Sequence, residues 1–129
     1  MQKILSVLLL FFVLIKSSHA EWENWKEQDR YLFVASEVAM MADWATTRYG
    51  VRHFKDTHYN YYETNFMLGK YPSMKTVDIY MTTMLVSNYY IADWIPDKDN
   101  YRSFYLGFRT LDHGLAARHN LQFGWHLRF

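Results

Sequence analysis

The sequence contains no cysteine among its 129 residues, which excludes disulfides, thiolate metal sites, a cysteine nucleophile and a cysteine-linked lipid anchor. It also lacks an excess of one charge, because 14 basic and 13 acidic residues leave a formal net charge of +1. A nucleic-acid-binding domain usually gathers a basic excess on one element, and no element here carries one. We therefore expect no nucleic-acid partner. The length suffices for one domain with a modest core.

Long apolar runs are scarce too. The longest covers residues 4–15, and its twelve residues are too few for a bilayer span, which needs about 20. Lys3 precedes this run, and Ser18-His19-Ala20 follows it with small residues at the positions that a signal peptidase reads. This order predicts an exported chain with a signal peptide over residues 1–20, cleaved after Ala20. The alternative is a retained anchor.

Aromatic residues are abundant: 11 Tyr, 9 Phe and 5 Trp make up 19% of the chain. This proportion is high for a small soluble domain. Tyr and Trp favour places where one end of the ring is dry and the other wet, such as interfaces and membrane boundaries. The composition therefore favours a protein that works at such a boundary.

Residues 31–49 have helical periodicity, and one stripe of the predicted helix is small and polar. Its members, at spacings of three and four, are Ser36, Ala39, Asp43, Thr46 and Gly50. Small residues let helices approach closely, and Gly50 is a natural stop for the helix. Asp43 has two interpretations. It faces solvent or caps a neighbour, or it is a buried acid paired across the bundle.

Residues 51–60 show no clear period and are predicted to form an exposed linker. His53 and His58 lie in it, but loop histidines are usually solvated, and we expect no metal site. A polar turn follows over residues 61–73. Glu63 and Asn65 can bond backbone groups of this turn. Pro72 and Ser73 then read as a helix start, with Ser73 as the N-cap.

The second predicted helix covers residues 77–95, and Pro96 ends it. Its seam at spacings of three and four contains Val77, Met81, Met84, Asn88, Ile91 and Ile95. The helix is close in length to a membrane span, but its two aspartates, threonines, serine and asparagine suit it poorly to the hydrocarbon core of a bilayer. We interpret Asn88 as a polar residue that sets the register of an apolar seam.

The loop at residues 97–100 precedes a third helix, which Asp99 or Asn100 is expected to cap. The third helix carries a second small-residue stripe, which is a plausible mate for the stripe of the first helix: Ser103, Gly107, Thr110, Gly114 and Ala117. Asp112 and His119 stack on one face, with His113 beside them. The Asp–His pair is either a base with its orienting group or an ordinary ion pair.

Five polar residues from the helices and the turn are predicted to form one hydrogen-bonded cluster that fixes the helix packing. They are Asp43, Thr46, Glu63, Asn65 and Asn88. The connection is long enough to fold back along either helix, and an unpaired member would cost about 1–3 kcal/mol. At the other end, apolar residues alternate with polar ones over 121–129, a period of two that predicts an extended aromatic tail.

Several short motifs carry a resemblance to a known family. They are Asp43-Trp44-Ala45-Thr46-Thr47-Arg48-Tyr49, Tyr62-Glu63-Thr64-Asn65, Leu68-Gly69, Pro72-Ser73, Val77-Asp78 and Tyr80. Together they resemble an uncharacterised family of short bacterial and phage envelope proteins, in which an Asp-x-x-Thr helix precedes a Glu-x-Asn-Pro turn. The resemblance covers about half of the mature chain and implies membrane-like later helices. Phe66 stands where the family usually has proline.

The sequence therefore predicts an all-α fold, a small three-helix bundle with membrane-like helices in a single domain over residues 21–129. We favour an exported, membrane-associated envelope protein with a non-enzymatic structural or interaction role. Its partner is a membrane or another envelope protein, and no cofactor is expected. Two alternatives stay open: a soluble periplasmic binding protein, and a hydrolase at the membrane surface. The catalytic candidates for the hydrolase are Asp43, Glu63, Asp112 and His119.

Overall fold

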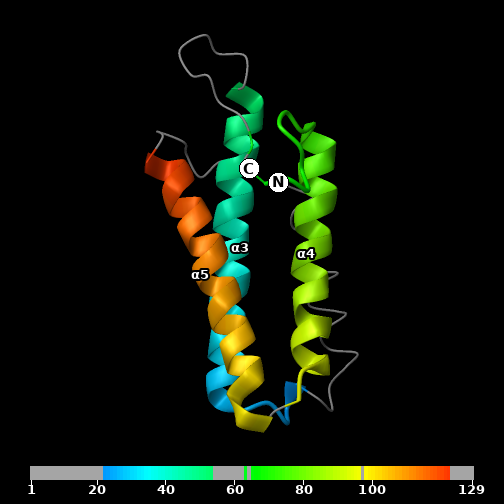
Figure 1. Ribbon diagram of the computed structural model, residues 1–129, viewed down its shortest axis with the longest axis vertical. Helices are drawn as coiled ribbons and strands as arrows, with labels where there is room; N and C mark the ends of the chain where they lie inside the picture. The colour runs from blue at the N-terminus through cyan, green and yellow to red at the C-terminus, as the bar shows by residue number, and fades with distance from the viewer. Residues whose placement is uncertain (1–21, 54–62, 64, 97, 123–129) are drawn as a thin grey trace.

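The computed structural model describes residues 22–53, 63, 65–96 and 98–122. In this part of the chain, three long helices pack together: α3 (Glu27–His53), α4 (Met74–Trp94) and α5 (Tyr101–Gln122). A short 3₁₀ turn, η1 (Lys98–Asn100), leads into α5. Figure 1 shows α3 and α5 side by side and running in the same direction, with α4 running the opposite way. The prediction of an all-α three-helix bundle is confirmed.

The first helix is longer than predicted at both ends. It begins at Glu27, where Glu27 and Asp29 place negative charge at the positive end of the helix dipole. It passes through Gly50 and ends at His53, so the predicted stop at Gly50 is wrong. Gly50 is a buried residue within the helix, three residues before its end. Residues 51–53, predicted to be linker, therefore belong to α3, and His58 lies outside the described residues.

The second helix has the expected caps. Ser73 is the N-cap of α4, and its hydroxyl accepts a hydrogen bond of 3.1 Å from the backbone N–H of Thr76. The helix ends at Trp94, followed by Ile95 in an extended conformation and then by Pro96. The sequence signals for both ends of this helix are thus confirmed.

The entry to α5 needs two residues in the left-handed region. Asp99 has φ 56° and Asn100 has φ 62°, a conformation that Asn and Asp tolerate better than most residues. At its other end, α5 continues to Gln122. Leu121 and Gln122, predicted to begin the extended tail, are therefore helical, because α5 is still making its last turn. Residues 123–129 lie outside the described part of the chain, as does the predicted signal peptide.

The apolar core falls into two clusters. One lies between α3 and α4 and contains Met40, Trp44, Leu68, Val77, Met81 and Leu85. The other contains Trp25, Phe33, Tyr89, Ala92 and Leu106. In the second cluster the rings of Trp25 and Tyr89 stack with centroids 5.6 Å apart, and the guanidinium of Arg102 lies 4.7 Å from the Trp25 ring. This aromatic cluster ties the segment before α3 to the bundle.

The contact between α3 and α5 is far more extensive than the contact between α3 and α4, and it carries polar pairs near both ends and in the middle. Near one end, Asp29 accepts a hydrogen bond from Ser103. In the middle, Asp43 pairs with His113, and further on Asn120 donates to Thr46 with a distance of 3.0 Å. We call this line of contacts the α3/α5 seam. Of the small-residue stripe predicted on α5, only Ser103 and Ala117 are buried. A Cβ added at Gly107 or Gly114 would meet nothing within 4 Å, so these glycines do not mediate close helix packing.

Candidate functional site

A polar pocket of about 390 Å³ lies where α3, α4 and α5 meet the turn that precedes α4. The helices and the turn contribute to its wall Asp43, Thr47, Glu63, Asn65, Phe66, Met67, Leu68, Tyr80, Met81, Arg109, Asp112, His113, Ala116, His119 and Asn120. Its volume is in the range of small-molecule sites. It is the strongest candidate for a functional site among the described residues, because three acids, two histidines and an arginine line it together.

A buried pair of side chains forms the floor of this pocket. His113 Nδ1 of α5 lies 2.7 Å from Asp43 Oδ2 of α3, and the Thr47 hydroxyl donates to Asp43 Oδ1 with a distance of 3.4 Å. Asp43 and His113 are both buried. A proton on Nδ1 shared with the carboxylate leaves Nε2 of the neutral imidazole as an acceptor. This Nε2 is buried and has no hydrogen-bond partner among the described residues.

Arg109 lies one helical turn before His113 on the same face of α5. Its NH1 is 3.8 Å from Asp112 Oδ2, and its NH2 is 3.4 Å from the sulfur of Met40. Its Nε is buried and unpartnered within the described chain. Asp112 is 55% exposed, so its charge is largely screened by solvent. The guanidinium is therefore only partly compensated.

The turn before α4 closes the pocket from one side. Glu63 accepts a hydrogen bond from the backbone N–H of Asn65 with a distance of 2.9 Å. The side chain of Asn65 donates to the Tyr80 hydroxyl at 3.2 Å and accepts from the backbone N–H of Met67 at 3.0 Å. Phe66 lies at the second position of this turn and is exposed. The turn thus closes without proline, through Asn65.

All four predicted catalytic candidates, Asp43, Glu63, Asp112 and His119, line this pocket. The pairing inside it differs from the one that the sequence suggested. Asp112 lies beside Arg109, and the histidine that pairs with a carboxylate is His113, whose partner Asp43 comes from another helix. Along the described residues, no group of three His, Asp or Glu side chains could hold a metal ion.

The five residues of the predicted polar cluster belong to different hydrogen-bonded groups. Asp43 bonds His113 and Thr47, and Thr46 bonds Asn120 and the backbone carbonyl of Ala42. Glu63 and Asn65 bond within the turn. The amide of Asn88 donates to Ser36 at 2.9 Å and to Glu37 at 2.7 Å. Ser36 lies seven residues before Asp43, about 10 Å away along α3, which separates Asn88 from the pocket.

Glu37 is the buried acid that sequence reasoning missed. Burial raises the pKa of its carboxyl group to about 8, although the hydrogen bond from Asn88 and the charge of Arg109 both favour the ionised form. The sequence did contain a pattern that marks these interior positions, namely residues that recur every seven positions on two helices. Asp29, Ser36 and Asp43 repeat at this spacing on α3, as do Leu106, His113 and Asn120 on α5. Taken together, the two repeats predict which faces of α3 and α5 meet at the α3/α5 seam.

The chemistry available in the pocket is hydrogen bonding and proton exchange. His113 oriented by Asp43 has the arrangement of a general base with its orienting carboxylate. The described lining contains neither serine nor cysteine, and the hydroxyl of Thr47 is already bonded to Asp43. The lining residues therefore suit acid–base chemistry or ligand binding better than covalent catalysis by a serine.

Comparison with protein-family models, with curated proteins and with solved structures finds no match for this chain. The resemblance to short envelope proteins accordingly stays a prediction from short motifs.

Proposed function

We propose that the protein is a small exported, membrane-associated envelope protein with a non-enzymatic structural or interaction role. The observation that carries this proposal is the distribution of polarity in the bundle. Charged and amide side chains share the space between the helices with the two apolar clusters, although a water-surrounded protein places mainly apolar residues there. Many further large apolar side chains are exposed.

The polar interior is extensive. The buried polar and charged residues are Asp29, Ser36, Glu37, Asp43, Thr46, Thr47, Asn88, Arg102, Ser103, His113 and Asn120. Most of them bond across helices, as in the contacts of Asp29 with Ser103 and of Asp43 with His113. Most of their polar atoms pair with one another, which withdraws these groups from the surroundings of the bundle. Among the described residues, Asp29 Oδ2, Asn88 Oδ1 and His113 Nε2 have no hydrogen-bond partner.

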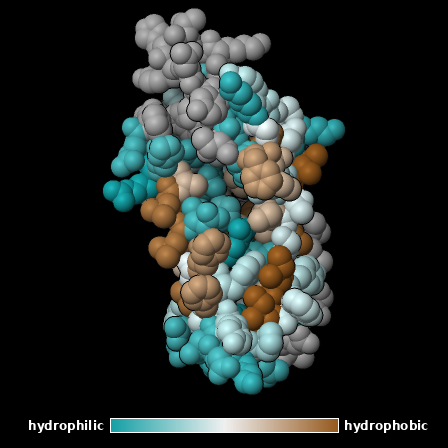
Figure 2. All heavy atoms as spheres, in the orientation of Figure 1, coloured by the Kyte–Doolittle hydropathy of each residue, from teal (hydrophilic) through white to brown (hydrophobic). Residues whose placement is uncertain are grey.

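The outer surface of the middle of the bundle is correspondingly apolar. We define the apolar band as the exposed residues of segments 31–51, 79–92 and 101–117. They are Tyr31, Val34, Val38, Ile79, Thr83, Tyr90, Ile91, Tyr101, Phe104, Phe108, Leu111, Asp112 and Leu115. Within these fully described segments, only Thr83 and Asp112 are exposed and not apolar or aromatic. In Figure 2, apolar residues follow α5 along one side of the face.

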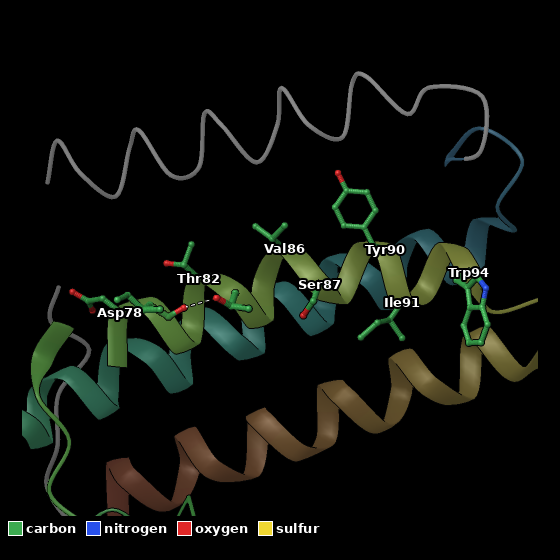
Figure 3. Close-up of a pocket in the computed structure, with 9 residues that line it drawn as sticks. Asp78, Thr82, Val86, Ser87, Tyr90, Ile91 and Trp94 are labelled. Atoms are coloured by element: carbon green, nitrogen blue, oxygen red, sulfur yellow. Dashed lines mark hydrogen bonds between the residues drawn. The ribbon is translucent and has the colours of Figure 1, made fainter. Parts of the chain in front are cut away.

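The side of α4 adds a broad apolar hollow to the band. Its volume is about 830 Å³, and its wall consists of Asp78, Ile79, Thr82, Thr83, Val86, Ser87, Tyr90, Ile91 and Trp94. Figure 3 shows Val86 and Tyr90 pointing away from α3 and α5. Trp94, which is 86% exposed, lies at one end of the hollow, and Trp is common at the level of lipid headgroups.

None of the helices in the described segments combines the length and the apolar character required to cross a membrane. Lipid contact is therefore proposed for the assembled bundle rather than for any helix alone. Exposed charges cluster outside the band, at the bundle ends, for example Lys26 and Glu27 at one end and Lys75 and Arg118 at the other. An exposed apolar surface of this extent marks a membrane or protein interaction site.

Fractionation of the tagged full chain tests this proposal. The protein should stay in the membrane pellet after a carbonate wash, because its retention depends on apolar contact rather than on charge. Lysines at Val38, Ile79 and Phe108 together should release it, whereas the control Gln28→Lys, at an exposed position outside the band, should not. Clean release of the unaltered protein would favour the soluble periplasmic alternative.

The Asp43–His113 pair favours a second candidate, a hydrolase at the membrane surface. Hydrolysis of p-nitrophenyl esters and phosphates by the purified protein tests it. The His113→Gln variant should lose this activity if His113 is the base, while the exposed control Arg118→Gln should keep it. Equal rates for a folded His113→Gln variant and the unaltered protein, or no hydrolysis by either, would remove this candidate.

A further inference from the structure

The outward face of α5 differs from the outward faces of the other two helices. Five large side chains lie on it, with exposed fractions between 57% and 78%: Tyr101, Phe104, Phe108, Leu111 and Leu115. They follow one another at spacings of three, four, three and four residues. We call them the α5 stripe. This spacing is the heptad repeat by which one helix packs its side chains between those of a partner helix.

The faces of α3 and α4 lack such a stripe. On α3 the largest exposed apolar residues are Tyr31, Val34 and Val38, and the positions that would continue them along the helix are partly or fully buried. On α4, Ile79 and Tyr90 are separated by the exposed polar residue Thr83. The α5 stripe is therefore the one continuous row of large exposed side chains on the described helices.

One flank of the stripe carries Tyr105, Asp112 and His119, again seven residues apart. Asp112 is the one exposed charged residue within the apolar band as the structure describes it. Placing the Asp112 carboxylate in the hydrocarbon of a membrane would be energetically costly, whereas a protein partner can offer it a hydrogen-bond donor. The stripe is thus better suited to a protein helix than to lipid along this flank.

We propose that the α5 stripe binds the α5 stripe of a second copy of this chain in antiparallel orientation about a two-fold axis. In this register Phe108 of one copy lies opposite Leu111 of the other, and Phe104 lies opposite Leu115. The flanking Asp112 then comes next to Tyr105 of the other copy, whose hydroxyl is a donor. Each contact occurs twice, as a two-fold axis requires.

The flank of the stripe and the helix dipoles select the antiparallel orientation. Antiparallel pairing brings Asp112 next to Tyr105 of the other copy and opposes the two helix dipoles. Parallel pairing would place the two Asp112 charges at the same level and align the dipoles. The pairing leaves the outward faces of α3 and α4 for lipid.

Because the chain has no cysteine, disulfide trapping of single-cysteine variants of the full chain tests the register directly. Phe108→Cys and Leu111→Cys lie next to the axis and should each form covalent dimers on mild oxidation. Phe104→Cys alone should not, because its two copies would be about 16 Å apart along the helices. A mixture of the Phe104→Cys and Leu115→Cys variants should form a covalent heterodimer. Ile79→Cys on α4 is the exposed control and should form no covalent dimer.

Two results would overturn the proposal. Efficient trapping of Phe104→Cys or Leu115→Cys alone would show parallel pairing, and no trapping at any position would show that the stripe faces lipid or another protein. Circular dichroism of each variant confirms that it keeps its helices. The carbonate wash of the same variants reports membrane association independently, so failure of the pairing is distinguishable from failure of the proposed function.

Discussion

His113 Nδ1 lies 2.7 Å from Asp43 Oδ2 and joins α5 to α3 across 70 residues of sequence. Both side chains are nearly removed from solvent, with 7% and 10% exposure. A buried pair of this kind adds little net stability compared with apolar residues of the same shape, but it penalises any packing that separates its members. It therefore specifies which faces of α3 and α5 meet.

Removing either member should be strongly destabilising. We expect Asp43→Ala and His113→Ala each to lower the free energy of unfolding by roughly 3–5 kcal/mol, because each leaves a buried polar partner unpaired. The double variant should cost clearly less than the sum of the single changes. Denaturant titration followed by circular dichroism measures all three values. Additive losses would mean that the two side chains do not interact.

The stability of the bundle should fall as the pH rises, because of Glu37. Burial raises the pKa of this carboxyl group from 4.5 to about 8, so the folded chain binds a proton that the unfolded chain has lost between these values. The free energy of unfolding should therefore decrease by up to about 1.4 kcal/mol per pH unit in this window. Glu37→Gln cannot ionise and serves as the control. An equally steep slope in that variant would assign the effect elsewhere.

Ser73 should contribute measurably to α4. Its hydroxyl accepts from the backbone N–H of Thr76, and Ser73→Ala removes this cap. We expect a loss of about 1 kcal/mol in the free energy of unfolding. Ser73→Asp, which keeps an acceptor and suits the helix dipole, should restore stability. A loss in Ser73→Asp as large as that in Ser73→Ala would argue against capping.

Export predicts a defined N-terminus. The order of Lys3, the apolar run and the site at Ala20 predicts cleavage after Ala20. Mass spectrometry of the protein isolated from its host should then find a chain that begins at Glu21. Recovery of the unprocessed chain from the envelope would support the retained anchor instead.

Local signals were enough to predict the helices. Ser73 and Pro96 mark the two ends of α4, and the apolar and polar periodicity of α3 and α5 indicated helices there. The predicted small-residue stripe of α5 is buried only at Ser103 and Ala117. These features depend on neighbours within a few residues, which one sequence displays.

The partners within the site could not be predicted in the same way. Asp43 could have met any of several donors, and its choice of His113 depends on the register of α3 against α5. That register is set by many contacts along the α3/α5 seam rather than by one motif. Asn88 was expected near Glu63 but bonds Glu37, because fourteen residues of α4, about 21 Å of helix, separate it from the turn.

The central claim is that the bundle contacts lipid through the α3 and α4 parts of its apolar band, where no charged side chain is exposed. Labelling of single-cysteine variants with a membrane-impermeant maleimide in opened membranes tests it most directly. We predict that Val38→Cys and Ile79→Cys, in the band, react far more slowly than Arg52→Cys and Lys75→Cys near one bundle end, and that detergent removes the difference. Fast labelling of Val38→Cys and Ile79→Cys in the opened membranes before detergent is added would contradict the claim.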